Sequence, residues 1–137
     1  MIDDTKKIPY VDFCAQWEKE SHVLLPIIEK TLKSGLYVGG EEVERFEKNI
    51  AQYCDVKYAI ATNSGTDALM LALRLLGDNS GDEVITPPNS FVSSTAAIVH
   101  LGAKPVFVDV LPDQNIDPEL IKDKITKKTT AIMPVHL

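Results

Sequence analysis

A small polar turn with phosphate-binding chemistry stands near the middle of the chain, within the segment 58–76. Residues 62–66 read Thr-Asn-Ser-Gly-Thr, between a short apolar run and a helix-forming sequence. Ser64 or Thr66 can cap that helix, and Gly65 lets the backbone approach a ligand closely. The first amides of a helix lack intrahelical acceptors and lie at the positive end of its dipole. These features favour an anion site, most naturally one for a phosphate.

The same turn also has a purely structural interpretation. Many strand-to-helix corners carry a Ser or Thr cap and a Gly only to form the corner. The chain has no Walker pattern, because no Lys follows Gly65 and Thr66, and it has no G-x-G-x-x-G. Asp67 suits the helix dipole but repels a phosphate unless its side chain points elsewhere. The turn alone leaves both interpretations open.

Composition limits the class of protein. The 137 residues are 45% hydrophobic and 25% charged, which is typical of a soluble globular domain. The net charge of −6 argues against a nucleic-acid partner. The polar N-terminus has no signal-peptide core and no apolar run could span a bilayer, so we expect a cytoplasmic protein without a membrane partner. Cys14 and Cys54 are expected to be reduced thiols, and no spacing predicts a metal site.

The N-terminal part is predicted to be helical. Apolar residues at helical spacing indicate a helix over Gln16–Lys33, which Pro26 should kink or split. A glycine-rich loop, Gly35–Gly40, follows and suits either close approach of a ligand or a flexible connection. A second amphipathic helix is predicted at Glu41–Tyr53.

Beyond this point short apolar strands alternate with helices. Uniformly apolar strands of this kind are typical of a parallel sheet covered by helices on both faces. We therefore expect an α/β fold with a mostly parallel sheet and flanking helices. The expected strands are Lys57–Ala61, Glu83–Thr86, Pro105–Val110 and Thr130–Val135, and the expected helices are Thr66–Leu76, Val92–Leu101 and Pro118–Ile125.

Ligands bind at the carboxyl ends of the strands in such a sheet. The polar turn, Phe91 and His136 follow predicted strands, and Asp109 lies near the end of one, so all four should open onto this edge. Phe91 can stack on a flat ligand, but it can equally be a hydrophobic plug over the sheet edge.

Seven segments, in this order and at this spacing, resemble the DegT/StrS group of PLP-dependent sugar aminotransferases. The resemblance covers nearly the whole chain from about residue 34 onward, which makes it much more specific than the polar turn alone. The segments are Gly35–Gly40 (Gly-x-Tyr-x-x-Gly), Glu42–Ala51 (E-x-x-x-F-E-x-x-x-A), Asn63–Leu69, Gly81–Ile85, Phe91-Val92, Gly102–Asp109 and Ala131–Leu137.

The resemblance implies the fold and the cofactor site. Residues 1–34 would form an N-terminal helical segment, and residues 35–137 the first part of the PLP-binding, fold-type-I large domain, truncated at its C-terminus. The phosphate of pyridoxal 5'-phosphate would be held by Gly65, Thr66 and the amide of Asp67, and Phe91 would stack on its ring. The Tyr37–Gly40 loop would lie near the substrate or a partner subunit, and His136 is assigned no chemical role.

The resemblance also implies that catalytic residues lie elsewhere. In the family the Schiff-base lysine, and the acid that pairs with the pyridine nitrogen, come after the segment matched by Ala131–Leu137. We therefore assign no catalytic residue in this chain, expect that lysine beyond residue 137, and expect residues 1–137 alone to be inactive.

The implied function is the transfer of an amino group from an amino acid, glutamate, to a nucleotide-linked keto-sugar. The full-length protein would act as a homodimer. Three alternatives stay open: a PLP-dependent sugar dehydratase of the same family, a non-catalytic truncated product that keeps phosphate binding and oligomer contacts, and, ranked last, a generic nucleotide-binding domain. The sugar, the nucleotide and the carbon position cannot be read from these residues.

Overall fold

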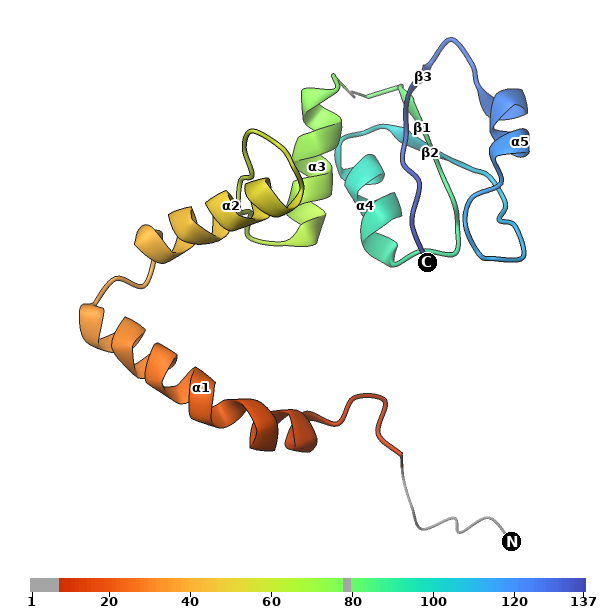
Figure 1. Ribbon diagram of the computed structural model, residues 1–137. Coiled ribbons are helices and arrows are strands. Elements are labelled where there is room, and N and C mark those ends of the chain that lie inside the picture. Colours follow the sequence, from red (N-terminus) through yellow and green to blue (C-terminus); the bar gives the residue numbers. More distant parts are fainter. Residues whose placement is uncertain (1–7, 78–79) are drawn as a thin grey trace, which may run out of the picture. The chain divides into compact units, whose positions relative to one another are not determined.

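The computed structural model describes residues 8–77 and 80–137. The chain divides into two compact units, Met1–Ile60 and Ala61–Leu137, and each is described by itself (Figure 1). The domain boundary expected between residues 34 and 35 is a different one: it concerns domains of the whole protein and stays a prediction. Within the described ranges, no helix is both long enough and apolar enough to cross a membrane.

The first unit begins with helix α1, Phe13–Ser34. Asp12 caps its start by accepting a 3.0 Å hydrogen bond from the Ala15 amide, and Gly35 ends it in the left-handed region with φ of 71°. Pro26 lies inside α1 without dividing it, so of the predicted kink or split, the split does not occur. Proline removes one backbone donor, and the turns on either side of it continue the helix.

Helix α2, Glu41–Tyr53, follows with the predicted bounds. Its first turn is acidic, which complements the helix dipole, and Ala51 is its one buried side chain among the described residues.

The predicted strand at Lys57–Ala61 is wrong. These residues form no strand, and Tyr58 and Ile60 are 72% and 82% exposed. A strand needs a hydrogen-bonded neighbour, and none of the described strands pairs with this segment.

The second unit contains a parallel sheet in the order β2-β1-β3, as the apolar strand pattern predicts. The strands are β1, Glu83–Thr86, β2, Lys104–Phe107, and β3, Thr129–Ile132. Strand β1 is central and has the most buried residues, because it is paired on both sides. The last two strands start one residue earlier than predicted and end three residues earlier.

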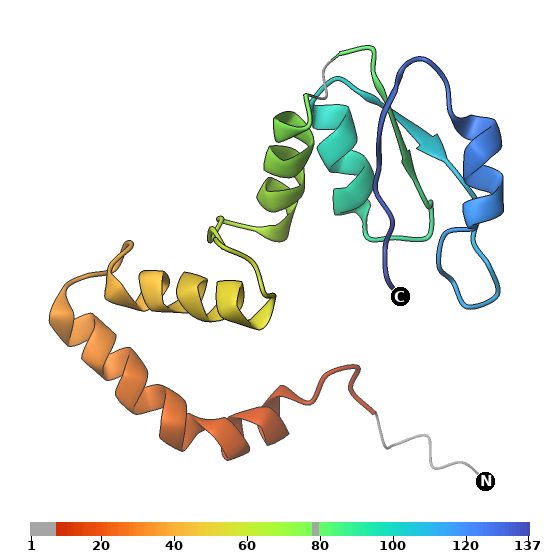
Figure 2. The same cartoon turned by 45° about the horizontal axis from the view of Figure 1, so that its top comes forward.

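Helices cover both faces of this sheet. Helices α3, Gly65–Leu75, and α4, Val92–His100, lie side by side on one face (Figures 1 and 2). Helix α5, Pro118–Ile121, lies on the other face and continues into a 3₁₀ turn, Lys122–Lys124. The predicted helix Pro118–Ile125 is thus shorter and partly 3₁₀.

The core lies between β1 and the helices α3 and α4. It joins five buried side chains, Leu73, Val84, Ala97, Ile98 and Ala103. Complete burial of a side chain such as Val84 or Ile98 contributes about 1.5–3 kcal/mol to folding. This packing fixes the start of α3 and α4 relative to the carboxyl edge of the sheet.

Candidate functional site

Ser64 caps helix α3, which decides between the two caps that the sequence allowed. It has an extended backbone, and its Oγ accepts a 3.1 Å hydrogen bond from the Asp67 amide. Its carbonyl accepts the first helical bond, from Ala68 at 3.0 Å. Helix α3 therefore begins directly after the polar turn, and the first amides of the helix lie at its exposed N-terminal end.

The amides of Gly65 and Thr66 are the free donors of this end. Among the described residues neither has an acceptor. A Cβ added at Gly65 would meet no heavy atom within 4 Å, so the space beside the turn is open to a ligand. Two unpaired amides at a helix N-terminus beside open space fit a phosphate group.

The amide and the carboxylate of Asp67 both form hydrogen bonds with Ser64 in the polar turn. Its carboxylate Oδ2 accepts a 2.9 Å hydrogen bond from the Ser64 hydroxyl, while its amide donates to the same oxygen of Ser64. The Asp67 amide can therefore reach a phosphate only if the phosphate replaces Ser64 Oγ as its acceptor.

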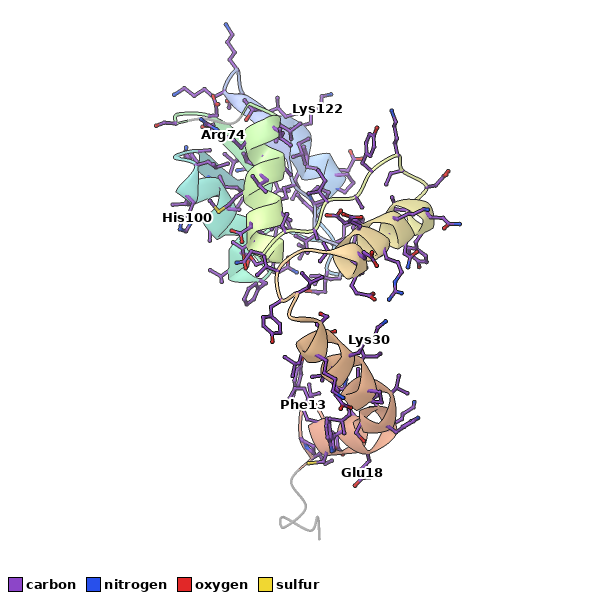
Figure 3. The ribbon with its side chains drawn as sticks, turned by 90° about the vertical axis from the view of Figure 1, so that its left-hand side faces the viewer. Phe13, Glu18, Lys30, Arg74, His100 and Lys122 are labelled. Carbon is purple, nitrogen blue, oxygen red and sulfur yellow. The ribbon has the colours of Figure 1, made fainter. Side chains whose placement is uncertain are left out.

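A hydrogen bond joins the starts of α3 and α4. Thr66 Oγ1 lies 2.8 Å from Ser93 Oγ, which is in the first turn of α4. Helices α3 and α4 run in the same direction from this bond between their first turns. Their last turns contain Arg74 and His100, which are labelled in Figure 3. The amino ends of both helices thus lie together at the carboxyl edge of the sheet.

Phe91 stands at the N-cap position of α4, two residues before Ser93, and its side chain is 77% exposed. Its carbonyl accepts hydrogen bonds from the Ser94 amide and the Ser90 hydroxyl, both 3.2 Å. A 2.6 Å bond between the Ser90 and Ser94 hydroxyls tightens the same corner. The backbone of Phe91 is held while its ring remains uncovered, so the ring is accessible to a ligand.

The corner before Phe91 is tied to the loop that follows β2. Asn89 Nδ2 donates to the carbonyl and to the Oε1 of Gln114, at 3.2 and 3.3 Å. Within that loop the Asn115 amide donates to Asp113 and lowers the pKa of the Asp113 carboxyl below its ordinary value.

Asp109 and His136 make no described hydrogen bond to the polar turn. The Asp109 carboxylate accepts from the Val110 amide, and this residue helps to line a cavity of about 450 Å³ beside α5. His136 is exposed. No described hydrogen bond joins either residue to the start of α3, whereas the Thr66–Ser93 bond joins the polar turn to the first turn of α4, beside Phe91.

Sequence reasoning missed Ser93. Its hydroxyl in the first turn of the helix after Phe91 was the available signal. Its pairing with a residue 27 positions away needed the packing of α3 against α4.

Comparison with known proteins gives a consistent family match. Residues 19–137 match the model of the DegT/DnrJ/EryC1/StrS aminotransferase family. The chain is 42% identical over 135 residues to a dTDP-3-amino-3,4,6-trideoxy-alpha-D-glucose transaminase of Streptomyces venezuelae, covering 98% of this chain and 36% of the relative. It is 44% identical over 115 residues to a 3-oxo-glucose-6-phosphate:glutamate aminotransferase of Bacillus subtilis, covering 83% of this chain and 26% of that protein.

A solved Bacillus subtilis structure with bound cofactor PMP shares the fold. The TM-score is 0.85 at 38% identity, and the match covers 98% of this chain and 32% of the solved chain. This chain thus spans about a third of the length of its relatives. The free amides of Gly65 and Thr66 and the uncovered ring of Phe91 fit the phosphate and the ring of such a cofactor. The chain therefore belongs to the DegT/DnrJ/EryC1/StrS family of pyridoxal phosphate-dependent sugar aminotransferases.

Proposed function

We propose that the complete product of the reading frame encoding this chain transfers an amino group from glutamate to a nucleotide-linked keto-sugar. The single observation that carries the proposal is the open helix end at Gly65 and Thr66 in a chain 42% identical to a nucleotide-sugar transaminase. The Bacillus subtilis relative supports glutamate as the donor. That relative is named for a sugar phosphate, so the nucleotide linkage rests on the Streptomyces relative.

Within this chain we assign the cofactor's phosphate to the start of α3. The amides of Gly65 and Thr66 and the Thr66 hydroxyl would donate to it, and the Asp67 amide would join them once released from Ser64. Phe91 would lie against the pyridine ring, from a backbone that Ser90 and Ser94 hold. When bound, the cofactor supplies an electron sink, and the protein binds, orients and tunes it.

The proposal leaves the reactive lysine outside these residues, as the family resemblance implies. Residues 1–137 would then bind the phosphate without forming a covalent bond to the cofactor. Treatment with pyridoxal phosphate and borohydride, followed by peptide mass spectrometry, tests this directly. A defined lysine of this chain carrying the adduct in high yield would contradict it.

The proposed reaction is tested with the complete product, pyridoxal phosphate, glutamate and a dTDP-linked 3-keto-sugar. Transfer predicts equal amounts of 2-oxoglutarate and of an amino-sugar nucleotide, measured by mass spectrometry. A deoxy keto-sugar nucleotide, formed in place of an amino-sugar nucleotide, would instead identify the dehydratase alternative. Absence of both products over a panel of keto-sugar nucleotides and phosphates would support a non-catalytic protein.

We also propose that the complete product is a cytoplasmic homodimer. Helix α1 leaves large apolar side chains half or more exposed, and a second subunit is one way to cover them: Trp17, Leu25, Ile27 and Leu32. Cys14 and Cys54 are free and exposed, in keeping with a reducing compartment. Light scattering tests the dimer, and a monomeric mass at micromolar concentration would exclude it.

A further inference from the structure

The hydroxyls of Thr66 and Ser93 form the one described side-chain hydrogen bond between α3 and α4. Their oxygens are 2.8 Å apart and partly buried, and the residues are 27 positions apart in sequence. Among the described residues, neither hydroxyl has another hydrogen-bond partner. The pair therefore has spare hydrogen-bonding capacity that a ligand can use.

The number of hydroxyl protons determines how a ligand would affect which of the two residues donates this hydrogen bond. Each hydroxyl has one proton to donate and can also accept. If Thr66 donates to Ser93, its proton is not available to an anion at the start of α3. If Ser93 donates to Thr66, the Thr66 proton is free to point at the anion. A phosphate has oxygens that accept, so it selects the second arrangement.

We propose that Ser93 is a positioning residue for the cofactor's phosphate, acting through Thr66. Ser93 donates to Thr66 Oγ1 and so directs the Thr66 proton to the phosphate. A hydroxyl that accepts one hydrogen bond becomes a stronger donor in the next, so the chain from Ser93 through Thr66 strengthens the contact. The role rests on the proposed phosphate site at Gly65 and Thr66.

The simplest competing role is a clamp that only holds α3 against α4. A clamp would change the stability of the fold, or the affinity for every ligand of the site alike. A positioning role changes only the part of the affinity that comes from the phosphate. Pyridoxal, which has the ring of the cofactor but no phosphate, separates the two effects.

The experiment measures dissociation constants of pyridoxal phosphate and pyridoxal for the complete product. The readout is the preference for the phosphate form, the ratio of the two constants. Ser93→Ala should lower this preference about fivefold, the loss expected for one ordinary hydrogen bond. Ser93→Thr keeps a hydroxyl and should restore it. Ser94→Ala is the matched control: the Ser94 hydroxyl bonds Ser90 beside Phe91, so its loss should change the two constants alike and leave their ratio unchanged.

A double-variant cycle tests whether Ser93 acts through Thr66. Thr66→Val should lower the preference about tenfold or more, because it removes a donor to a charged group. Adding Ser93→Ala to Thr66→Val should then have no further effect. An unchanged ratio in Ser93→Ala, or an equal loss in both backgrounds, would overturn the role of Ser93. A wild-type protein without any preference for the phosphate form would overturn the phosphate site itself.

Discussion

Ser64 and Asp67 bond each other in both directions at the start of α3. The Ser64 hydroxyl accepts from the Asp67 amide at 3.1 Å and donates to the Asp67 carboxylate at 2.9 Å. The cap therefore uses the third amide of the helix and leaves the amides of Gly65 and Thr66 for a ligand. It also holds the one carboxylate of the first turn of α3 at a fixed place.

Removal of this cap should destabilise the fold. Ser64→Ala leaves the Asp67 amide without its acceptor, and such a loss costs about 1 kcal/mol of unfolding free energy. Urea denaturation of the chain measures it. Ser64→Asp, which can still accept at the cap, is the control and should stay close to the wild type. An unaltered midpoint in Ser64→Ala would show that the cap does not stabilise α3.

Loss of the Phe91 ring should weaken cofactor binding with little change in stability. The ring is 77% exposed, so Phe91→Ala should change the unfolding free energy by less than about 0.5 kcal/mol. If the ring stacks on the pyridine, the affinities for pyridoxal phosphate and pyridoxal should both fall about fivefold. Phe91→Tyr keeps an aromatic ring and should bind normally. A large loss of stability with unchanged binding would instead identify Phe91 as a plug over the sheet edge.

Glu83, at the start of β1, should make the stability of the fold depend on pH. The Thr126 hydroxyl, 2.7 Å away, and then Lys104, at 3.4 Å, lower the pKa of this carboxyl from its ordinary value. A lowered folded-state pKa stabilises the protein above the unfolded pKa, and this contribution is lost as pH falls through the folded pKa.

Glu83→Gln should therefore unfold more readily than the wild type at pH 7, and the difference should shrink below about pH 4. Thr126→Val removes the largest cause of the shift and should raise the pKa of Glu83, measured by NMR titration of its carboxyl carbon. A difference in stability that is the same at pH 3 and pH 7 would mean that the ionised form makes no special contribution.

Two glycines should respond differently to a methyl group. Gly77 and Gly102 both have positive φ, 91° and 80°, where alanine costs about 1–2 kcal/mol. Among the described residues, a Cβ at Gly77 would meet no heavy atom within 4 Å, whereas at Gly102 it would lie 3.2 Å from Ser80 Cβ. Gly102→Ala should therefore unfold at a lower urea concentration than Gly77→Ala, by roughly a further 1 kcal/mol. Equal midpoints would show that Ser80 moves aside without cost.

Much of the fold follows from local pattern. The bounds of α2 and β1 are as predicted, because amphipathic spacing and a short apolar run between turn residues specify them. The strand predicted at Lys57–Ala61 has the same local pattern and fails, since a strand also depends on a neighbour that pattern does not reveal. Pro26 does not split α1 for a related reason, because one missing donor does not determine the whole helix.

Local sequence pattern also predicts only part of the candidate site. Gly65, Thr66 and Phe91 could be proposed from residue type and family resemblance, and the structure leaves their donors and ring free for that role. The engagement of the Asp67 amide by Ser64 was one of two caps that the sequence allowed, and only coordinates decide between them. Ser93 could not be assigned, because its role depends on a contact between two helices.

The most direct test of the phosphate site follows the backbone amides of the polar turn by NMR. Titration with pyridoxal phosphate should shift the amide signals of Gly65 and Thr66 strongly, and equal concentrations of pyridoxal should not. The amide of Leu75, at the far end of the same helix, is the internal control and should not respond to the phosphate. Equal shifts with both ligands, or shifts confined to residues outside the turn, would contradict a cofactor phosphate held at the start of α3.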